Sequence, residues 1–391
     1  MKKKIWLQPE WIVALLATLA ACALHFYYWL HIGGLWRDEV NLIVLSSQHS
    51  FADMARDSFP VLMPLIVRFW FAIGLAGSDI HLRLIGLIVG LGTVAALWVG
   101  AWKIRREPPL IGLVLLGLNS IMIFFGDSLR AYGLGSVAAI MLTASAFIFL
   151  KKPSAPRAGW MAFFATLSVQ VLYHNVVLVA AVCFGAWAVC WRRADGRAAV
   201  QILIGAIVSA ASLLPYVRML SSITSGGPAS MVFRTGATMR RFIFSCHDAF
   251  GSPLWGYMYV WVALALMIIG CACASLSRRP NGRADLPVSQ NAGSTMVPET
   301  DFRLFASVTL LFSAIVFPIF FWRAQMPMQS WYLLPFMASA VVCFDGARPV
   351  FPGLLRSVFI ALVAGTALVS TLTTGNLLSR QFSNVNIMAK E

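Results

Sequence analysis

Charged residues are scarce in this chain. Only 12% of its 391 residues are Asp, Glu, Lys or Arg, whereas 59% are hydrophobic and the mean hydropathy is +0.78. A soluble protein of this length cannot keep so many apolar side chains away from water, so a set of soluble domains is excluded. The apolar runs also lack period-two alternation and extend for about 18 to 23 residues, which indicates membrane-spanning helices.

The sequence also lacks the basic stripe with interleaved aromatic residues that is typical of nucleic-acid binding. The net charge is +15, but the Lys and Arg residues stand at the ends of apolar segments. We therefore expect no nucleic-acid partner and interpret the basic clusters as topology signals that lie on the cytoplasmic side. These clusters are Lys2-Lys3-Lys4, Lys103-Arg105-Arg106, Lys151-Lys152-Arg157, Arg192-Arg193-Arg197 and Arg278-Arg279-Arg283.

The hydropathy pattern predicts an all-α polytopic membrane protein with about eleven transmembrane helices. The N-terminus lies inside and the C-terminal tail outside. The predicted spans are residues 11–30, 80–102, 109–126, 131–150, 159–174, 175–191, 198–220, 254–276, 302–322, 331–347 and 352–372.

The loops between these spans divide the chain. Residues 1–220 form a membrane module with a first external loop at 31–79, and 221–253 form a second long external loop. Residues 254–375 form the C-terminal helices with a cytoplasmic linker at 277–301, and 376–391 form the tail. The apolar piece from Pro60 to Gly77 is short and carries Pro64 and Arg68, so we expect a helix in the outer interface. No repeat of 20–50 residues and no inverted half are found.

Cysteine is too sparse outside the membrane to form a disulfide there. Cys246 is the one cysteine in a predicted external loop, and Cys271 and Cys273 point to different sides of a helix, which is poor metal geometry. Leu19-Ala20-Ala21-Cys22 fits the pattern of a lipoprotein signal. Because Glu10 interrupts the leader and the apolar run continues to Leu30, we expect an uncleaved first helix.

Carboxylates avoid the centres of the predicted spans, and two adjacent ones follow the first span. Asp38 and Glu39 stand beside Trp36 and Arg37. Paired acids at a membrane surface could supply a general base and its partner, or bind a divalent cation. The alternative is a solvated loop with a local Arg–Asp pair.

Lysine is almost absent from the predicted outer face, where Lys390 is the one external lysine of seven. Arginine offers a planar fork for phosphate, and topology alone disfavours cations outside, so this preference indicates anion binding. The alternative is that the arginines reach lipid headgroups. The external arginines are Arg37, Arg56, Arg68, Arg83, Arg130, Arg218, Arg234, Arg240, Arg241 and Arg323.

Short patterns of arginine, aromatic and amide residues recur at the outer ends of the predicted helices. Because these ends share one membrane level, their side chains could line one outward-facing cavity. The patterns are Arg130-Ala131-Tyr132, Tyr173-His174-Asn175, and Arg323 with Gln329-Ser330-Trp331-Tyr332.

In the order of these patterns the chain resembles the integral-membrane type C glycosyltransferases of the dolichyl-phosphate-mannose protein mannosyltransferase type, which include bacterial aminoarabinose transferases and galacturonosyltransferases. The resemblance extends over about residues 5–340. It consists of Asp38-Glu39 after the first helix, Pro60 to Trp70 followed by Leu82-Arg83-Leu84, Arg130-x-Tyr132, Tyr173-His174, and Trp331-Tyr332-Leu333-Leu334-Pro335.

The chain departs from this family pattern at three places. Phe59-Pro60-Val61 stands where relatives often have His-Pro-Pro, Asp127-Ser128-Leu129-Arg130 stands for Gln-Glu-Ala-Arg, and Trp331 replaces a late arginine. These departures leave Arg130 or Arg323 to hold phosphate.

The resemblance implies a type C fold that transfers a sugar, with inversion, from a polyprenyl-monophosphate donor to a lipid, glycan or protein acceptor at the outer face of a bacterial inner membrane. Metal dependence is open in this family; we expect no metal or other cofactor, with a divalent cation as the alternative. Asp38 is the expected general base and Glu39 its partner or an acceptor anchor. Arg37, Arg83, Arg130, Tyr132 and Arg323 are the donor-phosphate candidates, and His174, Asn175, Gln329 and Tyr332 are the candidates for binding the sugar or the acceptor.

Two other functions fit the composition. A flippase or other transporter of lipid-linked saccharides would also need many helices, although transporters place ionisable residues and helix breaks at the membrane centre. A non-catalytic scaffold for envelope assembly is the second. Polar residues at the outer rim favour chemistry at the surface over both.

Overall fold

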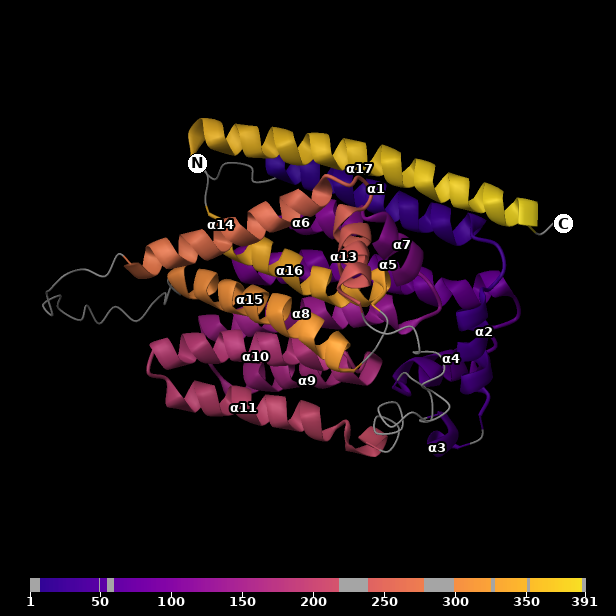
Figure 1. The fold of residues 1–391 in the computed structure, drawn as a ribbon, viewed down its shortest axis with the longest axis horizontal. Helices are drawn as coiled ribbons and strands as arrows, with labels where there is room; N and C mark the ends of the chain where they lie inside the picture. Colours follow the sequence, from indigo (N-terminus) through magenta and orange to yellow (C-terminus); the bar gives the residue numbers. More distant parts are fainter. Residues whose placement is uncertain are drawn as a thin grey trace, which may run out of the picture.

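The computed structural model describes residues 8–48, 50–54, 60–217, 238–277, 299–324, 328–349 and 352–388 (Figure 1). Parts of several predicted features lie outside these ranges. They include residues 1–7 with the first basic cluster, most of the linker 277–301 with its basic cluster, residues 221–237 of the second external loop, the end of the tail, and Arg56, Phe59, Arg218 and Arg234.

Helices make up the regular structure of the described residues, and no strand is found there. The first half of the chain forms α1 (Pro9–His31), α2 (Arg37–Ser46), α3 (Phe51–Met54), α4 (Leu62–Ala72), α5 (Asp79–Arg105), α6 (Leu110–Gly112), the π-helix η2 (Leu113–Gly117), α7 (Ser120–Gly126), α8 (Ala131–Lys151) and α9 (Ala155–Val171). The second half forms α10 (Asn175–Arg192), α11 (Gly196–Ala211), the short η3 (Leu214–Tyr216), α13 (Met239–Gly251), α14 (Tyr257–Ser277), α15 (Glu299–Arg323), η5 (Ser330–Leu333), α16 (Leu334–Ala347) and α17 (Gly353–Met388).

Nine helices among the described residues are long and apolar enough to cross a membrane. The chain is therefore an all-helical, multi-pass membrane protein, as its sequence predicts. Two of the eleven predicted spans, 109–126 and 159–174, are not among the nine. The second corresponds to α9, which has 17 residues, and the first is interrupted.

An asparagine interrupts the segment 109–126. Asn119 is the N-cap of α7, where its Oδ1 accepts from the backbone N–H groups of Ile121 and Met122 at 2.9 and 3.1 Å. A side chain that satisfies the first turn of a new helix competes with continuation of the old one. The preceding turn widens into η2, so this segment consists of α6, η2 and α7 in place of one straight helix.

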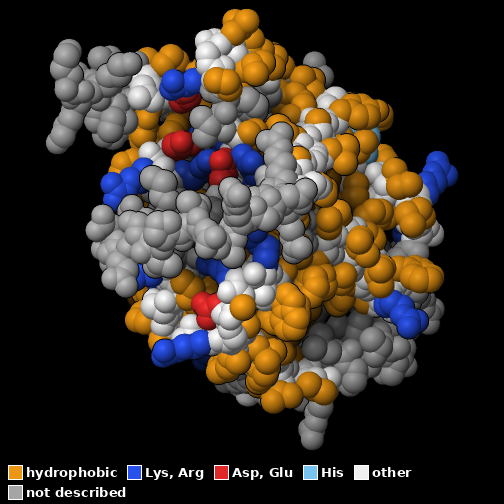
Figure 2. Space-filling model, turned by 90° about the vertical axis from the view of Figure 1, so that its left-hand side faces the viewer, with side chains coloured by type: hydrophobic (Ala, Val, Ile, Leu, Met, Phe, Trp, Pro, Cys, Tyr) orange, Lys and Arg blue, Asp and Glu red, His pale blue; other side chains and the backbone are white. Residues whose placement is uncertain are grey.

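The long helices run side by side, and the basic clusters meet at one end of the bundle. Lys151 at the end of α8 donates to the carbonyl of Lys103 in α5, and Arg193 at the end of α10 donates to Leu150 O at 2.6 Å. Figure 2 views this end, which carries many Lys and Arg side chains and few acidic ones, beside a hydrophobic flank. The clusters share one side as the topology requires, and its assignment to the cytoplasm stays a prediction.

The core of the bundle is built around α8 and the segment η5–α16, in whose most apolar 18 residues 78% and 83% are buried. By contrast, only 17% of the most apolar 18 residues is buried in α14 and in α17, and α17 runs along one edge of the molecule in Figure 1. The outer faces of these edge helices carry exposed leucines such as Leu266 and Leu362. Such faces suit contact with lipid chains.

The predicted first external loop is folded at the end of the bundle opposite the basic clusters. It contains α2, α3 and α4, which lie together at the right-hand end of Figure 1, and α2 packs against α4. α4 occupies the middle of the predicted interfacial piece from Pro60 to Gly77.

Candidate active site

The start of α2 places two adjacent carboxylates in different surroundings. α2 begins at Arg37 after the extended residue Trp36, and Asp38 and Glu39 follow in its first turn. Because consecutive side chains on a helix point about 100° apart, the two cannot share one environment. The Asp38 side chain is 29% exposed and that of Glu39 is 0% exposed. A substrate can therefore reach Asp38 but not Glu39.

Glu39 is held by four N–H donors. Arg83 in α5 donates from Nη1 and Nη2 to the two carboxylate oxygens at 3.2 and 2.8 Å, and Leu129 N donates to Oε1 at 2.7 Å. Trp36 N donates to Oε2 at 3.1 Å as the backbone half of a helix cap. Burial raises the pKa of Glu39, while Arg83 and the backbone N–H donors oppose this rise. Glu39 thus joins α2 to α5 and to the turn before α8.

Asp38 lies against the arginine that opens α8. Nη2 of Arg130 is 4.0 Å from Oδ2 of Asp38, and Nη1 of Arg130 donates to the backbone carbonyl of Asp38 at 3.0 Å. Arg130 is 7% exposed and is the N-cap of α8. On its other side Asp38 accepts from Nε of Arg37 at 3.4 Å, but Arg37 is 94% exposed. Arg130 is therefore the fixed cation of this site.

Aromatic rings continue the site from Arg130 toward η5. The Tyr132 ring lies 5.8 Å from Tyr332 and 6.4 Å from Trp331, measured between centroids, and Trp331 lies 4.4 Å from Phe125 in α7. Asp38 and Arg130 both act electrostatically on the hydroxyls of Tyr132 and Tyr332. Side chains from the outer ends of the predicted spans 109–126, 131–150 and 331–347 therefore meet in this cluster.

His174 extends this aromatic cluster to the start of α10. Its ring lies 5.4 Å from Tyr332 and 5.7 Å from Phe321, and Phe321 stacks on Tyr332 at 5.6 Å. Within the described residues Nε2 of His174 and Oδ1 of Asn175 are buried without a hydrogen-bond partner. Nδ2 of Asn175 donates to Ser168 of α9. A polar ligand group between the rings would satisfy these two atoms.

Three predicted site residues lie toward the rim. Arg323 ends α15 with an exposed side chain, Arg37 is almost fully exposed, and Gln329 is half-buried as the N-cap of η5. No ion pair joins Arg323 to a carboxylate in the described part of the chain. Of these three, Arg37 is the one for which the structure shows a contact with Asp38.

A buried pair that the sequence analysis missed holds the turn before Arg130. Nδ1 of His25 in α1 lies 2.6 Å from Oδ2 of Asp127, and the two residues are 1% and 2% exposed. Gly86 and Gly90 of α5 make room for the pair, since a Cβ at either position would overlap Asp127. This spacing of small residues four apart in a membrane helix was the available signal.

The second long external loop contains a helix that the sequence analysis did not predict. Thr238 is the N-cap of α13, and its hydroxyl accepts from Arg241 N at 3.3 Å. The helix runs across the direction of the long helices in Figure 1. Its end is anchored by Asn119, whose Nδ2 donates to the carbonyls of Ala249 and Ser252 at 3.0 and 3.1 Å. The spacing of Phe242, Ser245 and Ala249 was the signal for this helix.

Two cavities flank α13 near the aromatic cluster. One of about 220 Å³ is mainly apolar and lies between α13 and α15, where Phe321 forms part of its wall. The other, of about 270 Å³, lies between α7 and α13 and is lined by Phe125, His247, Asp248 and Trp255. Each cavity shares one ring with the cluster around Tyr132 and Tyr332, because Phe125 contacts Trp331 and Phe321 contacts Tyr332.

Metal-ligating side chains do not gather at this site. Within the ranges that the structure describes, no group of three or more His, Cys, Asp or Glu residues is placed to hold a metal ion. Metal dependence therefore stays a prediction from the sequence.

Comparison with solved structures yields weak structural likeness. No family model and no curated protein matches the sequence. The structure is similar to the arabinosyltransferase EmbB from Mycobacterium smegmatis, solved by single-particle cryo-EM, with a TM-score of 0.48 and 11% sequence identity. The match covers 98% of this chain and 42% of the EmbB chain, so this chain spans less than half the length of that protein.

Proposed function

We propose that this protein is a membrane glycosyltransferase that uses a polyprenyl-monophosphate sugar, with Asp38 as the general base. The observation that carries the proposal is the placement of Asp38, a reachable carboxylate held within 4.0 Å of the buried guanidinium of Arg130. Transfer of a sugar from a phosphate leaving group requires a base for the acceptor proton and a group that binds the phosphate. Asp38 and Arg130 provide such a pair side by side. We place this site at the outer face of a bacterial inner membrane.

The proposed reaction is a single displacement at the anomeric carbon. Asp38 accepts the proton of the acceptor hydroxyl or amine while that atom forms a bond to the anomeric carbon. The bond from the anomeric carbon to the phosphate oxygen breaks, and the polyprenyl monophosphate leaves with the electron pair. Arg130 stabilises the charge that grows on this phosphate, and attack opposite to the leaving group inverts the anomeric configuration.

Side chains around the pair take supporting roles in this proposal. Arg83 is committed to Glu39 and to the carbonyl of Gly34 at 2.6 Å, so we assign Glu39 and Arg83 to positioning in place of direct substrate contact. Arg130 with Tyr132 then binds the donor phosphate, and the exposed Arg37 and Arg323 guide it to the site. The sugar or acceptor would contact Tyr332, His174, Asn175 and Gln329, of which His174 and Asn175 offer the buried polar atoms without partners.

The cavities beside α13 suit the two parts of the substrates. The apolar cavity next to Phe321 would take the first isoprenoid units of the donor, because its wall offers mainly apolar side chains. The cavity with Asp248 and Trp255 would take the acceptor, since a carboxylate can bind sugar hydroxyls and a ring can pack against the sugar. The acceptor is a lipid, a glycan or a protein, and the proposed reaction needs no metal.

Transport of a lipid-linked saccharide is the second candidate function. The interruption of the segment 109–126 at Asn119 favours it, because transporters often carry broken helices within the membrane. In this chain, however, the Asp38–Arg130 pair lies at the end of the bundle rather than beside that interruption.

Purified protein in detergent, incubated with a panel of polyprenyl-phosphate sugars and a lipid extract, tests the proposal by mass spectrometry of the products. We expect a glycosylated product from the wild type and none from Asp38→Asn, with the same result after addition of EDTA. Asp53→Asn is the matched control, since Asp53 is another carboxylate of the first external loop and accepts from Ser50. It should retain activity.

The outcomes separate the two candidate functions. Product from both the wild type and Asp38→Asn would reject Asp38 as the base. No product from any donor, together with movement of a fluorescent lipid-linked saccharide across liposomes that contain the protein, would replace transfer by transport.

A further inference from the structure

A polar cavity of about 380 Å³ lies at the end of the bundle opposite Asp38. It is bounded by the first turns of α1 and α17 and by the segments that follow α5 and α16. Six charged side chains line it: Arg105, Arg106, Arg348, Arg356, Glu10 and Glu107. Two more carboxylates border this lining: Glu299 pairs with Arg105 and with Arg303, and Asp345 accepts from the backbone N–H groups of Ile111 and Gly112. With Arg303 included, five arginines stand against four carboxylates, and this excess of one positive charge favours an anion.

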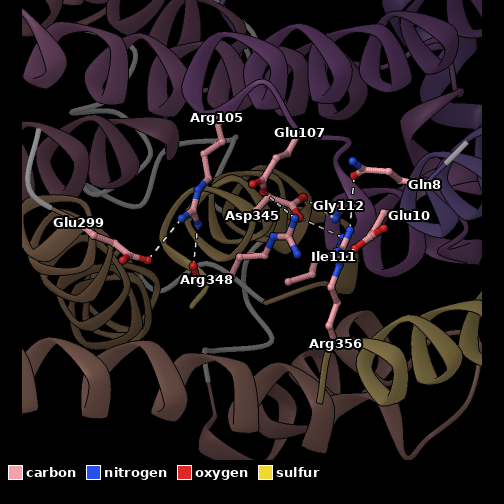
Figure 3. A network of polar contacts seen from close by, with 10 residues as sticks. All are labelled: Gln8, Glu10, Arg105, Glu107, Ile111, Gly112, Glu299, Asp345, Arg348 and Arg356. Atoms are coloured by element: carbon pink, nitrogen blue, oxygen red, sulfur yellow. Dashed lines mark hydrogen bonds and ion pairs between the residues drawn. The ribbon is translucent and has the colours of Figure 1, made fainter. Parts of the chain in front are cut away.

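Three of the arginines are held in place by contacts on several elements (Figure 3). Arg105 donates from Nη1 to the carbonyl of Arg348 at 2.6 Å, and Arg348 donates from Nη2 to Glu107 at 2.7 Å. Arg356 of α17 forms an ion pair with Glu10 of α1. In Figure 3 these guanidinium and carboxylate groups converge from separate elements. Fixed guanidinium groups lose little conformational freedom when they bind a further oxygen.

The fourth arginine differs from the other three. Arg106 follows α5 with a φ of 59°, and its side chain is exposed. Among the residues that the structure describes, no carboxylate forms an ion pair with it. Its positive charge is therefore available to a ligand in the cavity.

The helices α1 and α17 carry apolar side chains at the cavity and exposed apolar side chains farther along. Trp11 and Phe359 form part of the cavity wall, and the guanidinium carbon of Arg348 lies 5.7 Å from the centre of the Phe359 ring. Farther along the same helices, Leu16 is 61% exposed and Leu362 is 65% exposed. A ligand with a charged head and long apolar chains would match both surfaces.

We propose that this cavity binds the phosphate headgroup of an anionic membrane lipid, with its acyl chains lying along α1 and α17. Arginine is suited to phosphate because its planar fork donates two hydrogen bonds to two oxygens. Basic pockets between membrane helices at the positively charged side of a protein bind such headgroups. The volume is within the range of small-ligand cavities. This site is independent of the glycosyl transfer proposed for Asp38.

Binding of short-chain lipids to purified, delipidated protein in an uncharged detergent tests the proposal. The probes are dihexanoyl phosphatidylglycerol, dihexanoyl phosphatidylcholine and inorganic phosphate, and binding is measured by microscale thermophoresis. We expect saturable binding of phosphatidylglycerol and an affinity at least tenfold lower for the other two. Arg106→Asn should weaken phosphatidylglycerol binding by about tenfold, because one charge-assisted contact to the phosphate is lost. Asparagine also accepts the left-handed backbone at this position.

A matched variant separates this site from general attraction to a basic surface. Arg197→Asn removes one exposed arginine from the same end of the bundle but outside the cavity, and it should bind phosphatidylglycerol as the wild type does. Equal weakening in both variants, or equal affinity for phosphatidylglycerol and phosphatidylcholine, would overturn the proposal. Inorganic phosphate that binds as tightly as phosphatidylglycerol would overturn the assignment to a lipid and identify a soluble phosphate as the ligand.

Discussion

Glu39 and Arg83 form a two-point ion pair in which both side chains are almost completely removed from solvent. The two N···O distances are 3.2 and 2.8 Å, and the side chains are 0% and 3% exposed. The pair connects the first turn of α2 to α5, and α2 also carries Asp38. Because Leu129 N donates to the same carboxylate, the pair also fixes the turn that ends at Arg130. One buried contact thus positions both the proposed base, Asp38, and the proposed phosphate-binding residue, Arg130.

Loss of this pair should destabilise the protein more than loss of an exposed charge. Arg83→Lys keeps the charge but removes the fork, and Glu39→Gln leaves Arg83 buried without a counter-charge. Removing one partner of a buried pair costs about 3 to 5 kcal/mol, so we expect a clear fall in the midpoint of thermal unfolding for Glu39→Gln and a smaller fall for Arg83→Lys. Arg37→Ala, at an exposed site, should leave the midpoint unchanged. Equal midpoints for Glu39→Gln and Arg37→Ala would contradict this prediction.

The His25–Asp127 pair should make stability depend on pH. Burial raises the pKa of Asp127 to about 6 from its ordinary value of 3.8, although His25 opposes the rise. A carboxyl whose pKa is raised by folding stabilises the folded state most when protonated. This contribution is complete below pH 4 and is lost as the pH rises through about 6. We expect the unfolding midpoint of the wild type to fall between pH 5 and pH 7.5 by more than that of Asp127→Asn, as measured by differential scanning fluorimetry. Parallel pH profiles in the two proteins would exclude Asp127 as the titrating group.

Hydropathy predicts most of the fold because each span must satisfy its own backbone in lipid, which makes long helices a local property of the sequence. The segment 109–126 is an exception, because it does not form one continuous helix. Its apolar content fits a helix, but Asn119 caps a new helix and bonds to the carbonyls of Ala249 and Ser252. These acceptors are more than 120 residues away in the chain, so a local pattern does not reveal them. The helix α13 has a local signal in its own spacing, but its contact with Asn119 joins residues equally far apart in the chain.

The site was predictable to the extent that its residues stand at helix ends. Asp38, Arg130, Tyr132, His174 and Tyr332 each lie next to the end of a predicted span, and the structure brings them together. The different burial of Asp38 and Glu39 was not predictable, because burial of Glu39 depends on Arg83 and on the turn at Leu129. His25 was missed because a histidine inside an apolar helix gives no sign of its partner.

Two glycines of α5 allow a test of the packing around Asp127. A methyl group at Gly90 would overlap the Asp127 carboxylate and the His25 ring, whereas one at Gly92 would meet no atom within 4 Å. Overpacking of this kind costs about 1 to 3 kcal/mol, so Gly90→Ala should lower the unfolding midpoint. Gly92→Ala should keep it or raise it, since alanine favours a helix by about 1 kcal/mol over glycine. A midpoint for Gly90→Ala at or above that of Gly92→Ala would contradict the observed packing.

Asp38 and Arg130 should affect different kinetic constants if one accepts the proton and the other binds the phosphate. Asp38→Asn removes the base, which contributes about 10² to 10⁴ in rate, and should lower kcat while donor binding persists. Arg130→Ala removes the fixed guanidinium, so the KM for the donor should rise by about tenfold or more, and Arg130→Lys should restore part of that loss because it keeps the charge. Arg240→Ala, an exposed arginine on α13, is the control and should leave both constants unchanged. The measurement is a titration of the donor for each variant, together with direct binding of a non-hydrolysable donor analogue. If Asp38→Asn and Arg130→Ala weaken binding of the analogue equally, then the two residues act as one binding unit. The proposed assignment of Asp38 as the base and Arg130 as the phosphate-binding residue is then wrong.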